Sequence, residues 1–551
     1  MATISKMARN EISKKNPVFS STRSTIETAF LRNNVVRVNS LKEAYKLACD
    51  SEGTIITDMP IYGPECVGLD SDSKVLLFND GAVYGRCAAA RRILGEPDVS
   101  ENTYALKIRE AVYKTRFKKM YHAQAYVGLH EDFMVKANLL VPEGFECILY
   151  NWLLNFQYMN ESMVEMYKKS HKYSGEGDIF VFADPDWTHD EHPLGLSFFD
   201  PEHNCAALLG MRYFGEFKKG TLTLGWSIAN RNGYAACHGG QKRYNLDNGR
   251  KFVAGVFGLS GSGKSTLTHA HHDEKYDVTV LHDDAFIISA KTGASIALEP
   301  SYFDKTADYP LSSPDNKFLL SAQNCGATID EDGKVVMVTE DIRNGNGRAI
   351  KSKLWSQNRV NKFDEPVNAI FWLMKDSTLP PILKIKDSVL AATMGATLAT
   401  KRSSAERLAN GVDPNALVIE PYANPFRTYQ LGRDYEKFVN LFNERNVDCY
   451  ILNTGFFMEN KISKEVTLGC LESVVEDKAI FKKWHKFEAL EIMEIEGFVP
   501  NMDDEEYLIQ LKERFKDRLD YIKSRDIEKG GYDKLPEETA KAIEKIVNSI
   551  F

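Results

Sequence analysis

The chain has 551 residues, enough for two to four domains with sizeable cores. The net charge of -8 argues against a surface that coats nucleic acid, and no part of the sequence approaches the ~18 consecutive apolar residues of a membrane span. The nine cysteines are scattered without a C-x-x-C pair, which indicates neither a zinc ribbon nor a disulfide scaffold. We therefore expect a cytoplasmic protein that binds neither nucleic acid nor membrane.

The N-terminal segment is rich in Ser, Lys and Arg and has one acid, Glu11, among its first 25 residues. An organellar transit peptide is one interpretation, and a short flexible arm is the favoured one. Residues 30–95 then alternate short apolar runs, at 35–38, 54–57 and 75–78, with turn signals and one helical stretch. This pattern is typical of α/β structure.

A polar loop follows the strand predicted at 178–183 and carries His189, Asp190, Glu191 and His192. Four such residues in a row on a loop are more typical of surface decoration than of a metal site, since their spacing matches no ligand pattern.

Further along, the alternating residues 221–227 (Thr-Leu-Thr-Leu-Gly-Trp-Ser) predict a strand. His269, His271 and His272 follow a glycine-rich loop, and we expect them to face solvent.

That loop matches the pattern G-x-x-x-x-G-K-[ST] and comes directly after an apolar strand at 253–257. Its residues, with the first residue of the helical run that follows, are Gly258, Leu259, Ser260, Gly261, Ser262, Gly263, Lys264, Ser265 and Thr266. In such a loop the backbone N–H groups cradle phosphates, Lys264 reaches the β- and γ-phosphates, and the Ser265 hydroxyl binds Mg²⁺. A second strand, at 278–281, ends in Asp283 and Asp284, which supply the carboxylates that metal-dependent phosphoryl transfer needs. The alternative, a glycine-rich turn between two buried strands, leaves the lysine and the aspartates unexplained.

The C-terminal part contains apolar strands at 369–373 and 449–453 and two amphipathic helices, the second opened by Pro536. Residues 391–425 are rich in small side chains, which favours a mobile cover over a core.

A second motif precedes the loop. Tyr213-Phe-Gly-Glu-Phe-Lys218-Lys219 reads Tyr-x-Gly-Glu-x-Lys-Lys, and His238 follows the second lysine by nineteen residues. With the loop Gly-Leu-Ser-Gly-Ser-Gly-Lys-Ser, these motifs resemble those of the ATP-dependent phosphoenolpyruvate carboxykinases, and the resemblance is collinear from about Tyr84 to the C-terminus.

The resemblance implies an α/β fold with two domains and an active site in the cleft between them. Residues 1–240 would form the substrate-side domain. Residues 241–551 would form a P-loop-containing nucleotide-binding domain with a mixed sheet and a mobile lid at about 391–425.

The implied reaction converts oxaloacetate and ATP into phosphoenolpyruvate, carbon dioxide and ADP, reversibly, through a metal-stabilised enolate and in-line phosphoryl transfer. The family's Mn²⁺ ligands map to Lys219, His238 and Asp284, and a nearby divalent cation lowers the pKa of a lysine enough for it to ligate. The other roles map to Arg86 and Tyr213 for the organic acid, Lys218 and Lys305 for phosphate, Arg343 for the bridge between substrate and γ-phosphate, and Lys461 and Thr467 for the nucleotide. The implied cofactors are ATP or ADP, Mn²⁺ and Mg²⁺, and the oligomeric state is left open.

The chain departs from the family pattern in three places. Cys87-Ala-Ala-Ala follows Arg86 where the family reads Ser-Pro-Lys-Asp-Lys, Ala285-Phe-Ile follows Asp284 where it reads Glu-His-Gly, and Lys461 stands in place of an arginine. Two alternatives therefore stay open. One is a P-loop kinase of another small acid or of a protein serine, as in HPr kinase/phosphorylase, and the other is a non-catalytic ATP-binding sensor.

Overall fold

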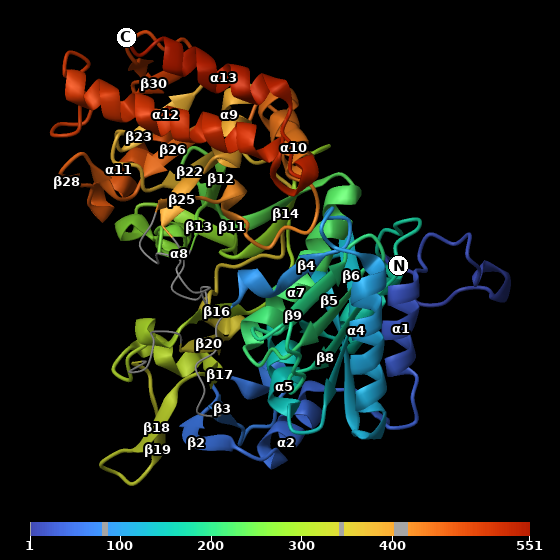
Figure 1. Cartoon of the computed structure of the whole chain (residues 1–551). Coiled ribbons are helices and arrows are strands. Elements are labelled where there is room, and N and C mark those ends of the chain that lie inside the picture. Colours follow the sequence, from blue (N-terminus) through green and yellow to red (C-terminus); the bar gives the residue numbers. More distant parts are fainter. Residues whose placement is uncertain (1, 80–85, 260, 341–346, 402–416) are drawn as a thin grey trace. The chain divides into compact units, whose positions relative to one another are not determined.

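The chain folds as a mixed α/β protein and divides into two compact units (Figure 1). The structure is a computed structural model that describes the chain except for residues 1, 80–85, 260, 341–346 and 402–416. Unit 1 comprises the described residues among 2–228 and 298–357, and unit 2 comprises those among 229–297, 358–401 and 417–551. The expected α/β class is confirmed.

The units do not follow a single boundary near residue 240. The chain leaves unit 1 near the end of helix α7 (Phe214–Arg231) and returns to it at Leu298. It returns because β17 (Leu319–Gln323) pairs in parallel with β3 (Lys74–Phe78), which joins residues far apart in sequence in one sheet. That sheet runs β16 (Tyr302–Lys305), β20 (Arg348–Lys351), β17, β3, β2 (Thr54–Pro60).

The larger sheet of unit 1 is mixed. Its strands, in spatial order, are β1 (Val35–Val38), β5 (Met120–His130), β6 (Phe133–Pro142), β8 (Ile179–Asp184), β10 (Cys205–Leu209), β9 (Leu196–Asp200) and β4 (Arg91–Ile93), with β7 (Gln157–Tyr158) paired to β5. Unit 1 also contains α2 (Leu41–Asp50), α3 (Pro64–Val67), α6 (Glu161–Lys169) and the hairpin β18 (Gly326–Ile329) and β19 (Val335–Val338).

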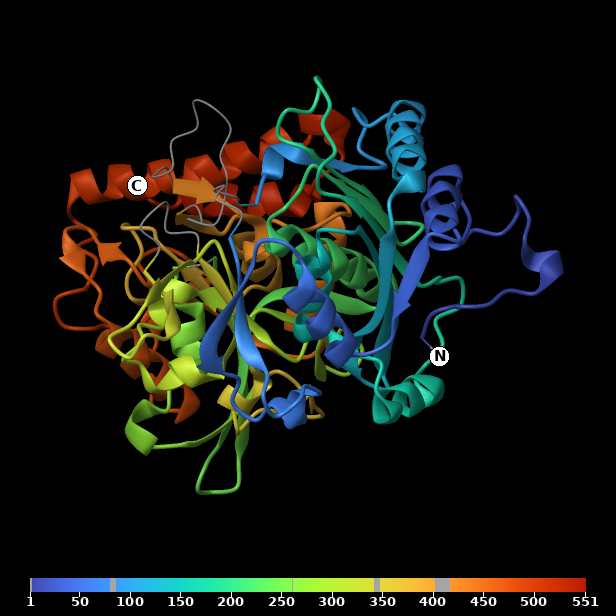
Figure 2. The same cartoon turned by 90° about the horizontal axis from the view of Figure 1, so that it is seen from below.

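Helices cover both faces of this sheet. On one face α1 (Ser21–Phe30) and α4 (Glu101–Lys114) lie side by side and bury an apolar cluster with the strands (Figures 1 and 2). The other face receives α7, where Gly220 packs against Leu208 of β10. Because side chains alternate along a strand, Leu208 packs against α7, while its neighbour Leu209 packs into the cluster with α1 and α4 on the opposite face.

The strand predicted at 221–227 is wrong, since these residues lie inside α7. Trp226 is 1% exposed and Trp152 of α5 (Glu146–Asn155) donates to Thr221 Oγ1 at 3.0 Å. A helix buried on nearly all sides carries no polar stripe, so its Thr-Leu alternation mimics a strand.

The N-terminal arm is anchored at its start. Thr3 is 1% exposed, and its hydroxyl donates to Asp178 Oδ1 at 2.7 Å. The described beginning of the arm is therefore packed against unit 1 rather than free.

Unit 2 is built on one long mixed sheet. Its strands, in spatial order, are β21 (Lys362–Phe363), β15 (Ser295–Ala297), β14 (Ala285–Ser289), β11 (Tyr234–Asn245), β12 (Lys251–Phe257), β22 (Ala369–Met374), β26 (Asp448–Asn453), β23 (Ile382–Ile385), β30 (Leu490–Ile492) and β29 (Lys482–Lys483), and β13 (Asp277–His282) also pairs with β11. Two hairpins lie outside it, β24 (Ala399–Lys401) with β25 (Leu417–Ile419), and β27 (Phe456–Phe457) with β28 (Asn460–Lys461).

Helices α8 (Lys264–His269) and α11 (Lys464–Val475) contribute to an apolar cluster with β11, β12, β22 and β26. The other helices of unit 2 are α9 (Ser388–Ala396), α10 (Leu431–Glu444), α12 (Glu505–Arg525) and α13 (Glu537–Asn548). The last two lie side by side near the C-terminus (Figure 1). Pro536 caps α13, as the sequence predicts.

Part of the expected lid belongs to the core instead. Residues 390–396 are all buried in α9, where a side chain on Gly395 would come within 2.7 Å of the rings of Trp372 and Tyr422. The small residues there allow close packing and do not signal mobility. Residues 402–416 of the expected lid lie outside the described residues.

Candidate functional site

The glycine-rich loop joins β12 to α8 in unit 2. Gly261 and Gly263 adopt φ of +83° and +93°, which only glycine reaches without strain. A Cβ on Gly258 would lie 2.2 Å from Ser262 Oγ, so a side chain there would collide with the loop. The Lys375 ammonium stabilises the loop by donating to the carbonyl oxygen of Gly261 at 2.8 Å. Ser260 lies outside the described residues.

Strand β11 passes directly under α8. A Cβ on Gly240 would come within 1.9 Å of Thr268 Oγ1, so glycine is required for this close approach. His238 lies two residues before Gly240 on β11. Its pairing with Ala285 of β14 fixes its place in the sheet.

Three predicted site residues come together at this point. His238 Nε2 lies 2.9 Å from Asp284 Oδ1, and Lys264 Nζ lies 3.5 Å from the same oxygen. Lys264 is 8% exposed and His238 is 6% exposed, so little water screens the Asp284 carboxylate from them. The cluster sets one carboxylate and one imidazole, both ligands of divalent metals, beside the lysine of the phosphate-binding pattern.

A residue that sequence reasoning missed holds Asp284 in place. His282 is fully buried, and its Nδ1 accepts hydrogen bonds from the backbone N–H groups of Asp284 at 3.0 Å and Ala285 at 3.2 Å. His269 Nε2 lies 3.3 Å from Asp283 Oδ2, which ties the first aspartate to α8. The only signal in the sequence was a histidine immediately before the aspartate pair.

The remaining nucleotide-side residues are also in unit 2. Ser265 and Thr266 are exposed on the first turn of α8, and Lys461 is exposed on β28. Thr467 is buried on α11, where its hydroxyl donates to the carbonyl of Ser463 at 3.1 Å. Their contacts with a nucleotide stay a prediction.

Unit 1 holds the lysine pair on α7. Lys218 Nζ lies 2.8 Å from Glu299 Oε1, and neither side chain has exposed surface. Asn155 donates to the second carboxylate oxygen of Glu299 at 2.6 Å. Lys219 is half-buried, with Nζ 5.7 Å from the ring centroid of Trp226. The two lysines therefore sit in different surroundings, and Lys218 is held in a buried ion pair.

The predicted acid-side arginine borders the start of the same helix. Glu216 is buried, and its Oε1 accepts the backbone N–H of Cys87 at 2.9 Å, which fixes the residue after Arg86. Burial raises the pKa of Glu216, while Arg91 and Arg86 act to lower it. One buried carboxylate thus lies near two guanidinium groups of this segment.

Tyr213 is buried at the entry to α7, and burial raises its pKa, opposed by Arg348. Lys305 lies opposite Arg348 in the pair β16 and β20. Arg343 lies outside the described residues.

The polar loop of unit 1 brings His189, Glu191 and His192 closer than expected, with ligand atoms within 4.8 Å of one another. Lys107 reaches into this group. Its ammonium forms an ion pair with Glu191 and lies 3.4 Å from His189 Nε2. A protein cation therefore already pairs with two members of this group.

His272 does not face solvent as expected. Its side chain is fully buried, with Nδ1 2.8 Å from Glu472 Oε1 and Nε2 2.8 Å from Lys242 Nζ. This cluster joins α11, β11 and the turn after α8.

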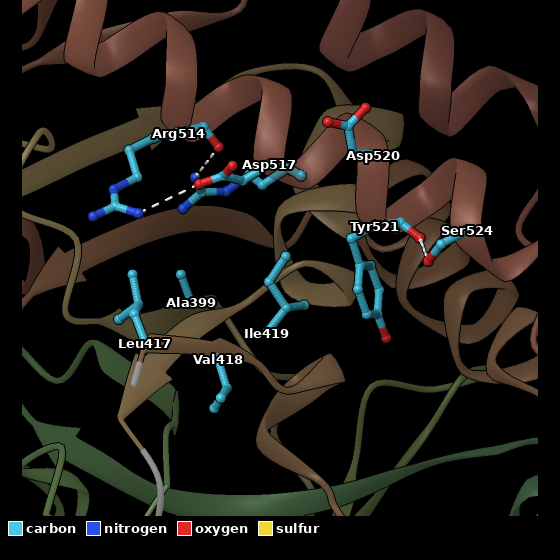
Figure 3. Close-up of a pocket in the computed structure, with 10 residues that line it drawn as sticks. Ala399, Leu417, Val418, Ile419, Arg514, Asp517, Asp520, Tyr521 and Ser524 are labelled. Atoms are coloured by element: carbon cyan, nitrogen blue, oxygen red, sulfur yellow. Dashed lines mark hydrogen bonds and ion pairs between the residues drawn. The ribbon is translucent and has the colours of Figure 1, made fainter. Parts of the chain in front are cut away.

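A pocket of about 570 Å³ lies between the hairpin β24 and β25 and helix α12 (Figure 3). Its arginines are already paired, Arg518 with Asp376 at 2.8 Å and Arg514 with Asp517 at 3.3 Å. None of the predicted site residues that the structure describes lines it.

Among the described residues, no helix combines the length and the apolar character that crossing a membrane requires.

The mixed α/β fold and the cluster of Lys264, Asp284 and His238 are consistent with an α/β enzyme that handles phosphorylated compounds. The family model of phosphoenolpyruvate carboxykinase matches residues 68–505, and the chain belongs to this family. The match includes both the glycine-rich loop and the segment Tyr213 to Lys219, so it separates the chain from the shorter protein-serine kinases considered as an alternative.

Similar proteins carry the name phosphoenolpyruvate carboxykinase (ATP). The protein of Aeropyrum pernix is 26% identical over 290 residues, which are 51% of this chain and 58% of that protein. The protein of Alkaliphilus oremlandii is 24% identical over 462 residues, 78% of this chain and 80% of the relative. That of Staphylococcus aureus is 24% identical over 403 residues, 68% and 71%.

Proposed function

We propose that the protein is an ATP-dependent phosphoenolpyruvate carboxykinase, which converts oxaloacetate and ATP into phosphoenolpyruvate, carbon dioxide and ADP in a reversible reaction. One observation carries the proposal. In a chain that belongs to this family, the side chains of His238 and Lys264 come from separate segments and both lie within 3.5 Å of Asp284 Oδ1. The relatives bear the name of the same activity.

The nucleotide phosphates bind at the loop between β12 and α8. Its backbone N–H groups surround the phosphates, Lys264 neutralises the β- and γ-phosphates, and the Ser265 hydroxyl is placed for Mg²⁺. The positive φ of Gly261 and Gly263 supports this role, since a loop of this shape can turn consecutive N–H groups toward one anion.

The donors at Asp284 fit a divalent cation. An imidazole nitrogen and a carboxylate oxygen 2.9 Å apart are close enough to share one ion, and Lys219 of α7 completes the Mn²⁺ set by resemblance. When bound, such a cation stabilises the negative charge that develops on the substrate oxygen after decarboxylation.

The organic acid binds to residues of unit 1. Arg86 and Tyr213 contact its carboxylates, Lys218 and Lys305 neutralise the phosphate that is transferred, and Arg343 bridges the substrate and the γ-phosphate. Glu216 supports this assignment, because its bond to the N–H of Cys87 fixes the backbone next to Arg86. The ion pair with the buried Glu299 limits Lys218 to small movements. We therefore assign Lys218 the role of a fixed positive charge near the transferred phosphate, rather than that of a side chain that moves to contact it.

The test is the formation of phosphoenolpyruvate from oxaloacetate and ATP with Mn²⁺ and Mg²⁺ present, followed through a coupled enzyme. Lys264→Ala is the control for nucleotide-dependent turnover, and GTP in place of ATP tests the adenine side. Wild-type protein that hydrolyses ATP or phosphorylates another acid, but forms no phosphoenolpyruvate, would overturn the proposal.

A further inference from the structure

The second nitrogen of His238 has a defined partner. His238 Nδ1 forms a hydrogen bond with the carbonyl oxygen of Ala423. A carbonyl can only accept, so Nδ1 carries the hydrogen, and in the neutral ring the lone pair is on Nε2, the atom 2.9 Å from Asp284 Oδ1.

The carbonyl is presented by a short buried segment, residues 421–426, which we call the support loop. Tyr422 and Ala423 adopt φ of 52° and 53°, in the left-handed region that side chains with a Cβ rarely enter. Such a conformation persists only where the surroundings impose it.

The surroundings do impose it at Tyr422. Its ring stacks on Phe438 of α10 with centroids 4.5 Å apart, and its hydroxyl donates to the carbonyl of Ala392 in α9 at 3.0 Å. Tyr422 and Ala423 are buried. The packing of Tyr422 therefore sets the direction of the carbonyl that follows it.

The support loop also confines the imidazole ring sideways. Phe426 meets His238 edge to face, with centroids 5.3 Å apart and planes at 83°. The backbone N–H of Phe426 donates to Asn424 Oδ1 at 3.1 Å, which keeps the end of the loop compact. The support loop thus contributes a hydrogen bond and a ring contact to the placement of His238.

We propose that the support loop is a positioning element for metal binding, which fixes the tautomer and the rotation of His238 so that Nε2 is directed at the cation site beside Asp284. The proposal rests on the proposed function, because it takes His238 as a metal ligand. Outer partners of ligating histidines commonly change metal affinity by about tenfold to a hundredfold when they are altered.

Mn²⁺ binding, measured by electron paramagnetic resonance of the free ion in the absence of substrates, tests the proposal. Ala423→Val inserts a β-branched residue at φ 53° and should displace the carbonyl, which weakens Mn²⁺ binding about tenfold or more. Ala423→Gly is the matched control, since glycine accepts this φ, and it should bind within about twofold of wild type.

The same pair of variants in a His238→Gln background shows whether the loop acts through His238. We expect the loss caused by Ala423→Val to vanish there, since the residue it positions is gone. The rise in melting temperature on adding ATP checks that Ala423→Val is folded. If this variant lacks the rise, Phe426→Leu takes its place. We expect Phe426→Leu to lose less Mn²⁺ affinity, and this loss should also vanish in the His238→Gln background.

The outcomes separate the two claims. A wild-type protein that binds Mn²⁺ no better than His238→Gln overturns His238 as a ligand, and with it the proposed metal set. A strong loss in His238→Gln combined with unchanged affinity in Ala423→Val and Phe426→Leu overturns the positioning role alone. A loss in Ala423→Val that persists in the His238→Gln background also overturns it.

Discussion

A buried lysine next to helix α8 is expected to make the stability of unit 2 depend on pH. Lys242 of β11 is 1% exposed, and its Nζ lies 2.8 Å from His272 Nε2 and donates to the carbonyl of Ala270 at 3.3 Å. Burial lowers the pKa of Lys242 to about 7, although the Glu472 carboxylate acts in the opposite direction. The folded protein therefore loses this proton near neutrality, whereas the unfolded chain keeps it until pH 10.5.

The sign follows from proton counting. Between these two pKa values the unfolded chain binds one more proton than the folded chain, so stability rises with pH, by at most about 1.4 kcal/mol per pH unit. The gap between the two pKa values corresponds to a penalty of about 5 kcal/mol well below pH 7, and about 2 kcal/mol of it is relieved between pH 7 and pH 9. Tyr244 and Tyr276, which face the same cluster, have pKa values raised by burial and stay protonated over this range.

Lys242→Met removes the titrating group and keeps its apolar length. The free energy of unfolding is measured by urea denaturation at pH 7, 8 and 9. Compared with wild type, the variant should gain most stability at pH 7, and this gain should shrink by about 2 kcal/mol by pH 9. Lys275→Met is the matched control. Lys275 pairs with the same Glu472 at 3.1 Å, but its hydrogen bonds raise its pKa, so it stays charged in both states. A constant difference between Lys242→Met and wild type from pH 7 to 9 would refute a neutral Lys242 in the folded protein.

The remaining predictions concern the nucleotide loop, the buried ion pair and the acid side. Lys264→Ala should weaken ATP binding by roughly tenfold to a hundredfold, seen as a lost rise in melting temperature with ATP, and an undiminished rise would count against the loop assignment. Glu299→Gln leaves the Lys218 charge buried without its counter-charge and should cost about 3–5 kcal/mol by urea unfolding, whereas the double variant Lys218→Met with Glu299→Leu should cost much less. Equal losses in the two proteins would contradict the buried pair as the cause. Arg86→Gln should raise the KM for oxaloacetate and lower kcat while the Kd for ATP, from calorimetry, stays within about twofold of wild type. A loss of ATP affinity instead would move Arg86 to the nucleotide side.

Local patterns in the sequence predicted the parts of the fold that depend on neighbouring residues. The strand at 253–257 became β12 and the one at 278–281 became β13, and two of the glycines between them, Gly261 and Gly263, have positive φ. These elements are specified by short runs of β-branched residues and by glycine at fixed places, and both signals are local.

Features set by distant partners could not be read in this way. The helical state of 221–227 depends on burial against the sheet of unit 1, and the return of the chain to unit 1 depends on β17 pairing with β3. The burial of His272 depends on Lys242 and Glu472, residues 30 and 200 positions away. In each case a tertiary contact outweighs local preference.

The candidate site in unit 2 is organised by a single strand. Strand β11 carries His238, then Gly239 and Gly240 where β12 and α8 approach closely, and then Lys242 under the end of α8. Since side chains alternate along a strand, a shift of one residue in the pairing of β11 would turn His238 away from Asp284. A side chain on Gly239 would lie 2.8 Å from the carbonyl of Val256, so bulk there would separate β11 from the strand that leads into the loop. The geometry between His238 and Lys264 therefore depends mainly on the backbone pairing of β11 and on Gly239 and Gly240, which allow β12 and α8 to approach it closely.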